Sequence, residues 1–309
     1  MSGYTSASSR VRRSRMALML LGFVAACSPR TLALVEFYSD GGFPPSSIDG
    51  NPGDASNAVS PDGSLAFSRI DGGVGDSPND GAPTSLSSGL VGLWHLDEAV
   101  GSTQAYDSSG NGNHGTLVGL DPAQAWVAGR WGGALATNGI GYASAPPSAG
   151  IVAIATGVTV SAWVYFDGVI SATDGFGTAI SRQVRNTDLQ YYHLSLSQGG
   201  VPSLFIGLSP KVAPVRPVAT KPIPSRTWTH LAGTYDGKLA ILYVEGVAVD
   251  SLSLPGTFNP DPVTPVLLGA NDNIAGVSEY FPGRLDEIAL YNRALSADEI
   301  RLLATTAPF

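Results

Sequence analysis

The chain has 309 residues, of which 43% are hydrophobic and only 14% are charged, and it contains 38 glycines and 22 prolines. That profile argues against a mainly helical protein and indicates many short strands joined by turns. Acidic residues outnumber basic ones by 25 to 17, so the chain lacks the electrostatic footprint of a nucleic-acid-binding protein, and anionic membrane surfaces are expected to repel it.

The N-terminal segment has the composition of an export signal. Arginines precede an apolar run over residues 16–26, and this run of 11 residues is shorter than the ~20 that a membrane-spanning helix needs. We therefore predict a signal peptide over residues 1–26.

Cys27, the only cysteine of the chain, follows Val-Ala-Ala at residues 24–26. This arrangement resembles a bacterial lipobox, in which the cysteine is lipidated and becomes the new N-terminus. The lipid would hold an exported protein at the membrane without a spanning segment. Ser28, in place of an aspartate, favours sorting to the outer membrane. The alternative is an incidental thiol after an ordinary signal peptide.

Residues 27–88 have the composition of a tether. From residue 38 they are rich in Asp, Gly, Ser and Pro, and their isolated apolar residues show no period. Such a segment buries too little apolar surface to offset the entropy of ordering it. Its Asp-Gly pairs are irregularly spaced, which disfavours calcium repeats. We predict a flexible acidic tether.

Strand patterns follow one another through residues 89–309. Residues 158–166 alternate between an aliphatic set and a second set that holds two aromatic and two hydroxyl side chains. In the next alternating stretch, one set is expected to face solvent: Tyr191, His193, Ser195 and Ser197.

Turn and cap signals complete this pattern. Residues 238–254 predict a hairpin that turns at Glu245-Gly246, and an Asp-Gly pair at 236–237 predicts the preceding turn. Ser296 and Glu299 form a capping box, which predicts the one helical segment. We predict an all-β domain over residues 89–309, built as a two-sheet antiparallel jelly-roll sandwich.

Several of these segments carry a family resemblance. In this order, they resemble the signatures of bacterial laminin-G-like domains: residues 92–119, 131–135, 160–164, 228–247 and 281–300. The resemblance covers residues 89–303 and implies the concanavalin A-like jelly roll that lectins and some glucanases share. The chain departs from the family pattern at Glu245 and Pro282, where asparagine is usual. Glutamate tolerates positive φ less well than asparagine, so the turn at Glu245 is expected to be strained or of another type.

The sequence lacks the catalytic motifs of the enzyme classes considered for this fold. Related glucanases place paired carboxylates on one strand in an E-x-D-x-E arrangement, which this chain lacks. The adjacent acids at 97–98 and 286–287 would point to opposite faces of a strand. There is also no nucleophile elbow and no zinc-binding histidine spacing, and His95, His193 and His230 are interpreted as structural. We predict a non-enzyme, with a glycoside hydrolase of non-standard site as an alternative.

The loop at residues 107–115 offers many oxygen donors. Asp107, Ser109 and Asn111 match the first, third and fifth positions of a helix-loop-helix calcium loop, and a glycine follows at the sixth. The twelfth position is Val118, where that motif needs a glutamate. By itself, the loop is therefore half of a cation site.

The family resemblance implies the missing partner. In calcium-binding jelly rolls of this type the early loop meets a C-terminal strand, and the matching residue is Asp286. Our hypothesis is one structural Ca²⁺ held by Asp107, Asn111, Asn113 and Asp286, with backbone carbonyls and water completing its shell. The alternative is a polar loop in which Asp107 caps backbone amides.

The predicted function is a surface-anchored binding module for carbohydrate or a protein partner. Candidate contact loops are residues 167–186, 208–226 and 269–283, because ligand contacts concentrate on loops. Three aromatic residues are assigned to the core instead: Trp163, Trp228 and Phe281. A structural or adhesive envelope protein is a further alternative.

Overall fold

The computed structural model describes residues 85–184, 190–208, 216–259, 261–273 and 276–306. The predicted signal peptide, Cys27 and most of the tether lie outside the described residues, so these assignments stay predictions. Within the described ranges, no helix is long and apolar enough to cross a membrane.

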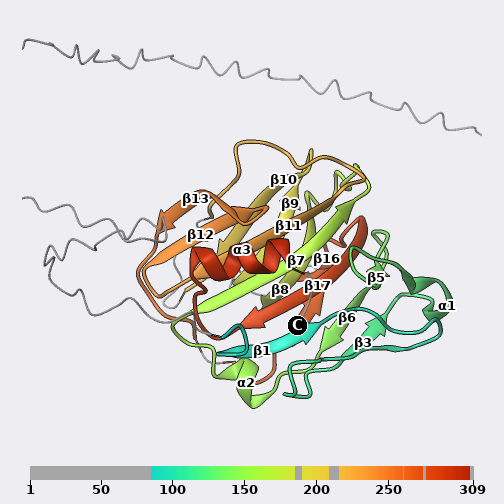
Figure 1. The fold of residues 1–309 in the computed structure, drawn as a ribbon, viewed down its shortest axis with the longest axis horizontal. Helices are drawn as coiled ribbons and strands as arrows, with labels where there is room; N and C mark the ends of the chain where they lie inside the picture. Colours follow the sequence, from blue (N-terminus) through green and yellow to red (C-terminus); the bar gives the residue numbers. More distant parts are fainter. Residues whose placement is uncertain (1–84, 185–189, 209–215, 260, 274–275, 307–309) are drawn as a thin grey trace, which may run out of the picture. The chain divides into compact units, whose positions relative to one another are not determined.

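Two large antiparallel sheets form the domain (Figure 1). The eight-stranded sheet has the order β13-β12-β11-β7-β17-β5-β4, and β1 also pairs with β17. Its strands are β1 (Leu90–Trp94), β4 (Trp126–Ala128), β5 (Gly133–Ala136), β7 (Val158–Phe166), β11 (Trp228–Tyr235), β12 (Leu239–Val244), β13 (Val247–Ser253) and β17 (Gly283–Tyr291).

The seven-stranded sheet has the order β10-β9-β8-β14-β6-β3-β2. Its strands are β2 (Gln104–Ala105), β3 (Gly115–Val118), β6 (Tyr142–Ala145), β8 (Phe176–Gln183), β9 (Gln190–Ser197), β10 (Val201–Ile206) and β14 (Val266–Leu268). A separate hairpin joins β15 (Asn271–Asn273) to β16 (Gly276–Ser278). The predicted all-β, two-sheet antiparallel sandwich is confirmed.

The core lies between the two sheets and follows the predicted alternation. The aliphatic set of β7 joins a core cluster with Tyr192, Leu194 and Leu196 of β9. The expectation that the other set of β9 faces solvent is wrong, because Tyr191, His193 and Ser195 are buried and only Ser197 is half-buried. Phe176 and Phe205 pack against His193, and the Arg216 guanidinium lies over both rings. Alternation predicts which side chains share a face, but not whether another segment covers that face.

The hairpin and the helix end where their local signals place them. β12 and β13 pair on either side of Glu245-Gly246. Glu245 has a positive φ of 52°, the backbone conformation for which asparagine is the usual residue of the family. Besides two four-residue helices, α1 (Pro122–Ala125) and α2 (Ala149–Val152), the described chain has one longer helix, α3 (Ala297–Thr305). Ser296 and Glu299 form the predicted capping box at its start.

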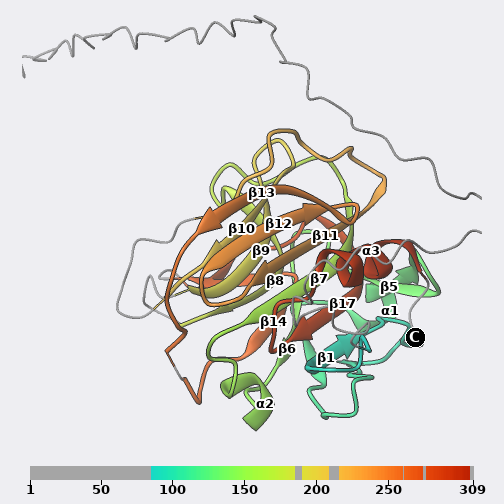
Figure 2. The same cartoon turned by 60° about the vertical axis from the view of Figure 1, so that its left-hand side comes forward.

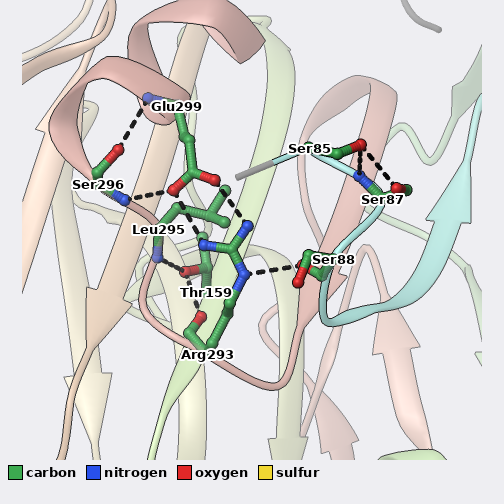
Figure 3. A network of polar contacts seen from close by, with 8 residues as sticks. All are labelled: Ser85, Ser87, Ser88, Thr159, Arg293, Leu295, Ser296 and Glu299. Carbon is green, nitrogen blue, oxygen red and sulfur yellow. Dashed lines mark hydrogen bonds and ion pairs between the residues drawn. The ribbon is translucent and has the colours of Figure 1, made fainter. Parts of the chain in front are cut away.

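Helix α3 lies against the outer face of the eight-stranded sheet (Figure 1). Its Ile300 packs in a second apolar cluster with Ala232, Tyr243 and Tyr291 of three strands. A polar network fixes the helix start (Figure 3). Glu299 receives two hydrogen bonds from the Arg293 guanidinium, at 2.7 and 2.9 Å.

The same guanidinium reaches the first residues of the domain. Arg293 Nε donates to the carbonyl oxygen of Ser88 at 2.8 Å (Figure 3). Thr159 Oγ1 donates to the Arg293 carbonyl and accepts the Leu295 amide, at 2.8 and 2.9 Å. The network therefore joins the entry into β1, the central strand β7 and α3.

Candidate functional site

The predicted cation loop is organised around its own aspartate. Asp107 is buried, and its Oδ1 accepts the backbone N–H groups of Leu93 at 3.0 Å and Ser109 at 2.9 Å. Its Oδ2 accepts the N–H of Asn113 at 2.8 Å. With two donors Oδ1 has no lone pair left for a cation, whereas Oδ2 keeps one. Asp107 thus caps backbone amides, as in the alternative interpretation of this loop.

The two predicted asparagine ligands turn their amide nitrogens toward β1. Asn111 Nδ2 donates to the carbonyl oxygens of Leu90 and Val91 at 3.0 and 3.1 Å, and Asn113 Nδ2 donates to Val91 at 2.7 Å. Within the described residues Asn113 Oδ1 is buried without a hydrogen-bond partner. That oxygen stays available to a cation.

Asp286, the predicted C-terminal ligand, contacts a different segment. Its Oδ2 accepts the N–H groups of Arg130 at 2.6 Å and Trp131 at 3.1 Å, and burial raises its pKa to about 7. Leu93 directs both its amide and its carbonyl group to the Asp107 loop, so β1 lies between that loop and β17.

The described contacts therefore give each predicted calcium ligand other partners, but they leave two of the ligand oxygens, Asn113 Oδ1 and Asp286 Oδ1, buried without one. No hydrogen bond joins Asp286 to Asp107 in the described part of the chain, and no group of three or more His, Cys, Asp or Glu side chains there could hold a metal. The calcium site at Asp107, Asn111, Asn113 and Asp286 stays a prediction.

Two histidines have the structural partners expected of them. His95 Nδ1 lies 2.9 Å from Glu287 Oε2, and this hydrogen bond raises the pKa of His95. His230 is buried, and its Nε2 lies 2.8 Å from Ser161 Oγ. Burial lowers the pKa of His230 to about 3, so the ring is neutral near pH 7.

The three predicted contact loops supply side chains beside β8, β9 and β10 of the seven-stranded sheet. The first loop supplies Phe176, the second Arg216 and the third Glu279. The Arg216 guanidinium lies 5.2 Å from the centre of the Phe176 ring. The Glu279 carbonyl accepts the Thr178 amide at 2.9 Å, which places Glu279 beside β8. Loops far apart in sequence thus surround one site.

Glu279 is the centre of a polar cluster at this site. Asn271 Nδ2 donates to Glu279 Oε2 at 3.0 Å and to Gln183 Oε1 at 2.7 Å. Asn273 Nδ2 lies 3.5 Å from Glu279 Oε1. The Glu279 side chain is 12% exposed, and burial raises its pKa, with a further contribution from the charge of Asp174. The surrounding amides hold the carboxyl group in one orientation while its edge reaches solvent.

His193 extends the cluster into the sheet. Its Nε2 lies 2.6 Å from Thr178 Oγ1, and Thr178 Oγ1 lies 3.5 Å from Glu279 Oε2. Burial lowers the pKa of His193 to about 3, so its ring is neutral. Its Nδ1 has no partner among the described residues, so we assign the proton to Nε2. The Thr178 hydroxyl is then free to donate to Glu279.

Aromatic rings flank the cluster on both sides. His193 stacks on Phe205 with ring centres 4.9 Å apart, and the Arg216 guanidinium lies 4.8 Å from the Phe205 ring centre. Tyr280 follows Glu279 in the chain, and its ring centre lies 6.2 Å from that of Tyr142. Both tyrosines are half-buried. A carboxyl group, amides and a hydroxyl beside aromatic rings are the groups that bind the hydroxyls and apolar faces of a sugar.

Sequence reasoning found the loops of this site but missed its central residues. Glu279 and Asn271 were not singled out, and His193 was interpreted as structural. The β15–β16 hairpin brings Asn271 and Glu279 together. Glu279 also has a positive φ of 54°, which is uncommon for glutamate and unreadable from composition. Polar residues at both ends of the short segment 271–279, within the predicted contact loop, were the signal that could have found the pair.

Comparisons with known proteins agree with this architecture. Residues 137–301 match a laminin G family model described as the concanavalin A-like lectin/glucanases superfamily. The match begins after the segment 92–119 and ends near the predicted limit of the resemblance. No curated protein sequence matches the chain.

Solved structures with similar folds include a domain of an arabinanase, the binding domain of a toxin and a sialidase. Domain 4 of AbnA, an extracellular arabinanase from Geobacillus stearothermophilus in complex with arabinotriose, is 24% identical with a TM-score of 0.54, over 70% of this chain and 98% of that one. The binding domain of Paraclostridial mosquitocidal protein 1 is 20% identical with a TM-score of 0.52, over 71% of this chain and 52% of that one. Trypanosoma rangeli sialidase is 20% identical with a TM-score of 0.51, over 70% and 33%. At these identities the likeness shows the fold alone.

Proposed function

The chain belongs to the concanavalin A-like lectin/glucanases superfamily, and we propose that it is a non-catalytic carbohydrate-binding module whose contact site is the Glu279 cluster. One arrangement carries this proposal: Thr178 of the first loop and Asn271 of the third hold the Glu279 carboxyl group, and Arg216 of the second loop lies over the ring of Phe176. Asn271 and Thr178 pre-orient the carboxyl group, which lowers the entropic cost of binding a sugar hydroxyl. The arabinotriose complex of the AbnA domain supports a sugar ligand.

The experiment is a glycan array, followed by calorimetry on the glycans that bind. Glu279→Gln removes the charge but keeps the shape of the side chain. Because a hydrogen bond to a charged group contributes about 1.5–3 kcal/mol, affinity should fall roughly 10- to 100-fold. Glu98→Gln is the matched control, since Glu98 is a half-buried glutamate whose Oε1 accepts the Tyr106 amide, away from this cluster.

Two results would contradict the proposal. If wild-type protein binds no glycan in the presence of calcium, the adhesive envelope protein becomes the better explanation. If Glu279→Gln binds as tightly as wild type while its thermal melting is unchanged, the ligand contacts another part of the domain.

A glycoside hydrolase is the second candidate. Glycosidases use a carboxylic acid of raised pKa as general acid, together with a second carboxylate. Burial and the charge of Asp174 raise the pKa of Glu279, which favours this second candidate. Incubating the chain with any polysaccharide that it binds, and measuring new reducing ends, separates the two functions. Release that Glu279→Gln abolishes would establish catalysis.

We further propose that a lipid on Cys27 holds this module at the cell envelope. The proposal rests on the sequence around Cys27, and the acidic residues 27–88 would let the module reach away from the membrane. Cys27→Ala should move the protein from the membrane fraction to the soluble fraction. Unchanged membrane attachment would refute the lipid anchor.

A further inference from the structure

A row of cationic and aromatic side chains crosses the outer face of the eight-stranded sheet. Arg284 of β17 pairs in register with Tyr165 of β7, and Tyr165 pairs with Trp228 of β11. The Arg284 guanidinium lies 4.9 Å from the Tyr165 ring centre, and the Tyr165 and Trp228 ring centres are 5.5 Å apart. These three strands lie side by side (Figures 1 and 2). All three side chains are half-buried, so part of each reaches solvent.

The row ends in a groove of about 580 Å³. Residues 219–224, from the second predicted contact loop, form one wall, and Trp228 and Glu245 contribute to the other side. The lining combines proline and aliphatic carbon with the hydroxyls of Thr220 and Thr227. A groove of this size, mostly apolar with a few polar groups, has the character of a small-molecule site. The assignment of Trp228 to the core is wrong, because the side chain is half-buried and lines this groove.

Positive charge gathers around the groove and the row. Lys221 lines the groove, and the Arg226 amide donates to Phe166 at the end of β7, two residues from Trp228. Among the described residues, Lys221, Arg226 and Arg284 form no ion pair. Two carboxylates lie beside these cations: Glu245 in the groove lining, whose Oε1 accepts the His230 amide at 2.8 Å, and Asp250 of β13, whose Oδ2 accepts the Val218 amide at 2.8 Å. Without ion pairs among the described residues, the three cations remain available to an anionic ligand.

We propose that this groove and row form a second binding surface, for a polysaccharide that carries a carboxylate on its sugar units. A sugar ring would stack on Trp228 in the groove, while Lys221 and Arg284 would bind carboxylates on successive units. Arg284 and Trp228 are two strand spacings apart, about 9–10 Å. Arg284 is therefore separated from the groove that Lys221 lines, and two separated cations suit a repeating anion better than a single phosphate.

The surface is distinct from the Glu279 site. That cluster lies on the outer face of the seven-stranded sheet, and its central residue is itself a carboxylic acid, which disfavours an acidic ligand there. The groove is lined by residues of β11, β12 and β13 in the eight-stranded sheet and by residues 219–224, which bond to the edge strand β10, and it contains Lys221 but no residue of the Glu279 cluster. The two surfaces can therefore be tested separately.

The test uses the full chain with polygalacturonate, and with the same polymer after complete methyl esterification. Esterification removes the charge and keeps the backbone, so wild type should bind polygalacturonate more tightly, and added salt should weaken that binding. Lys221→Gln and Arg284→Gln should each weaken it about fivefold. Lys238→Gln is the matched control, because Lys238 is an exposed lysine in the β11–β12 turn, outside the groove lining.

Each remaining outcome separates this proposal from its rivals. Glu98→Gln, outside both surfaces, should leave polygalacturonate affinity unchanged. A loss of affinity in Glu279→Gln would move the ligand to the other site. Equal binding of the esterified polymer, or unchanged binding by both Lys221→Gln and Arg284→Gln, would overturn the proposal. Equally tight binding to phosphatidylglycerol vesicles or duplex DNA would assign the surface to another polyanion. Thermal melting of each variant confirms that it is folded.

Discussion

Replacing Glu299 by glutamine should destabilise the domain measurably at neutral pH. The carboxylate accepts both Arg293 nitrogens and the Ser296 amide, and it belongs to the network that ties Ser88 to α3 (Figure 3). The hydrogen bonds from Arg293 are the main cause that lowers the pKa of Glu299 to about 2. Glutamine keeps the shape but cannot accept two charge-assisted bonds.

The magnitude follows from the pKa. A change from the ordinary value of 4.5 to about 2 corresponds to about 3 kcal/mol at 1.36 kcal/mol per pKa unit. Because the Arg293 side chain is 24% exposed, solvent screens part of this interaction, and we expect about 2 kcal/mol. For a domain of this size, the melting temperature should fall by roughly 4–8 °C.

The pH dependence gives the sharper test. The pKa of Glu299 is depressed in the folded state, so its contribution is complete above the unfolded value of 4.5. The contribution is lost as the pH falls toward about 2. Denaturant unfolding at pH 7 and pH 3 should show the gap between wild type and Glu299→Gln closing.

Asp298→Asn provides the control for this experiment. It removes an adjacent acid whose ion pair with Arg301 is exposed, with side chains 84% and 62% accessible, so the change should stay within about 0.5 kcal/mol. If both variants lose equal stability, or if the Glu299→Gln gap persists at low pH, the network does not stabilise the fold as argued.

Three further predictions concern the rest of the domain. Saturating calcium should raise the melting temperature of the wild-type protein, because calcium at 100-fold excess over its Kd adds about 2.7 kcal/mol to the free energy of unfolding. Asp107→Asn should reduce that rise. An equal melting temperature of the wild-type protein with calcium and with chelator would refute the calcium site. Acidification from pH 7 to pH 5 should lower the free energy of unfolding by about 2 kcal/mol through His230 alone, because burial lowers its folded pKa to about 3 and only the unfolded state takes up the proton. Urea unfolding of His230→Asn should show a smaller change of the free energy of unfolding with pH over that range. Gly129→Ala should destabilise the loop over Asp286, because the added Cβ would lie 1.8 Å from the Gly133 carbonyl oxygen and 2.6 Å from Asp286 Oδ2; a melting curve like that of wild type would show that the backbone there moves freely.

Local patterns accounted for much of the fold. The hairpin at Glu245-Gly246 and the capping box at 296–299 are short-range signals, and both occur where the sequence places them. Strand alternation likewise assigned Leu194 and Leu196 to the core. These features depend on residues within a few positions of one another, so no knowledge of the rest of the chain is needed.

The candidate site could be predicted only as a set of loops. Residues 167–186, 208–226 and 269–283 were named as contact segments, yet nothing in their composition says that they meet. Their meeting depends on strand order, which places β8 between β9 and β14. Asn271 and Glu279 then face each other through the β15–β16 hairpin.

The sequence by itself determined the all-β class, the two-sheet sandwich and the positions of its turns, because periodicity and turn chemistry are local. Only the tertiary structure decided that His193 is covered, that Asp107 caps amides of its own loop, and that Arg293 joins Ser88 to Glu299. Each of these contacts depends on sheet register and on which segment covers an exposed face. Those are properties of the packed chain, and a one-dimensional pattern does not contain them.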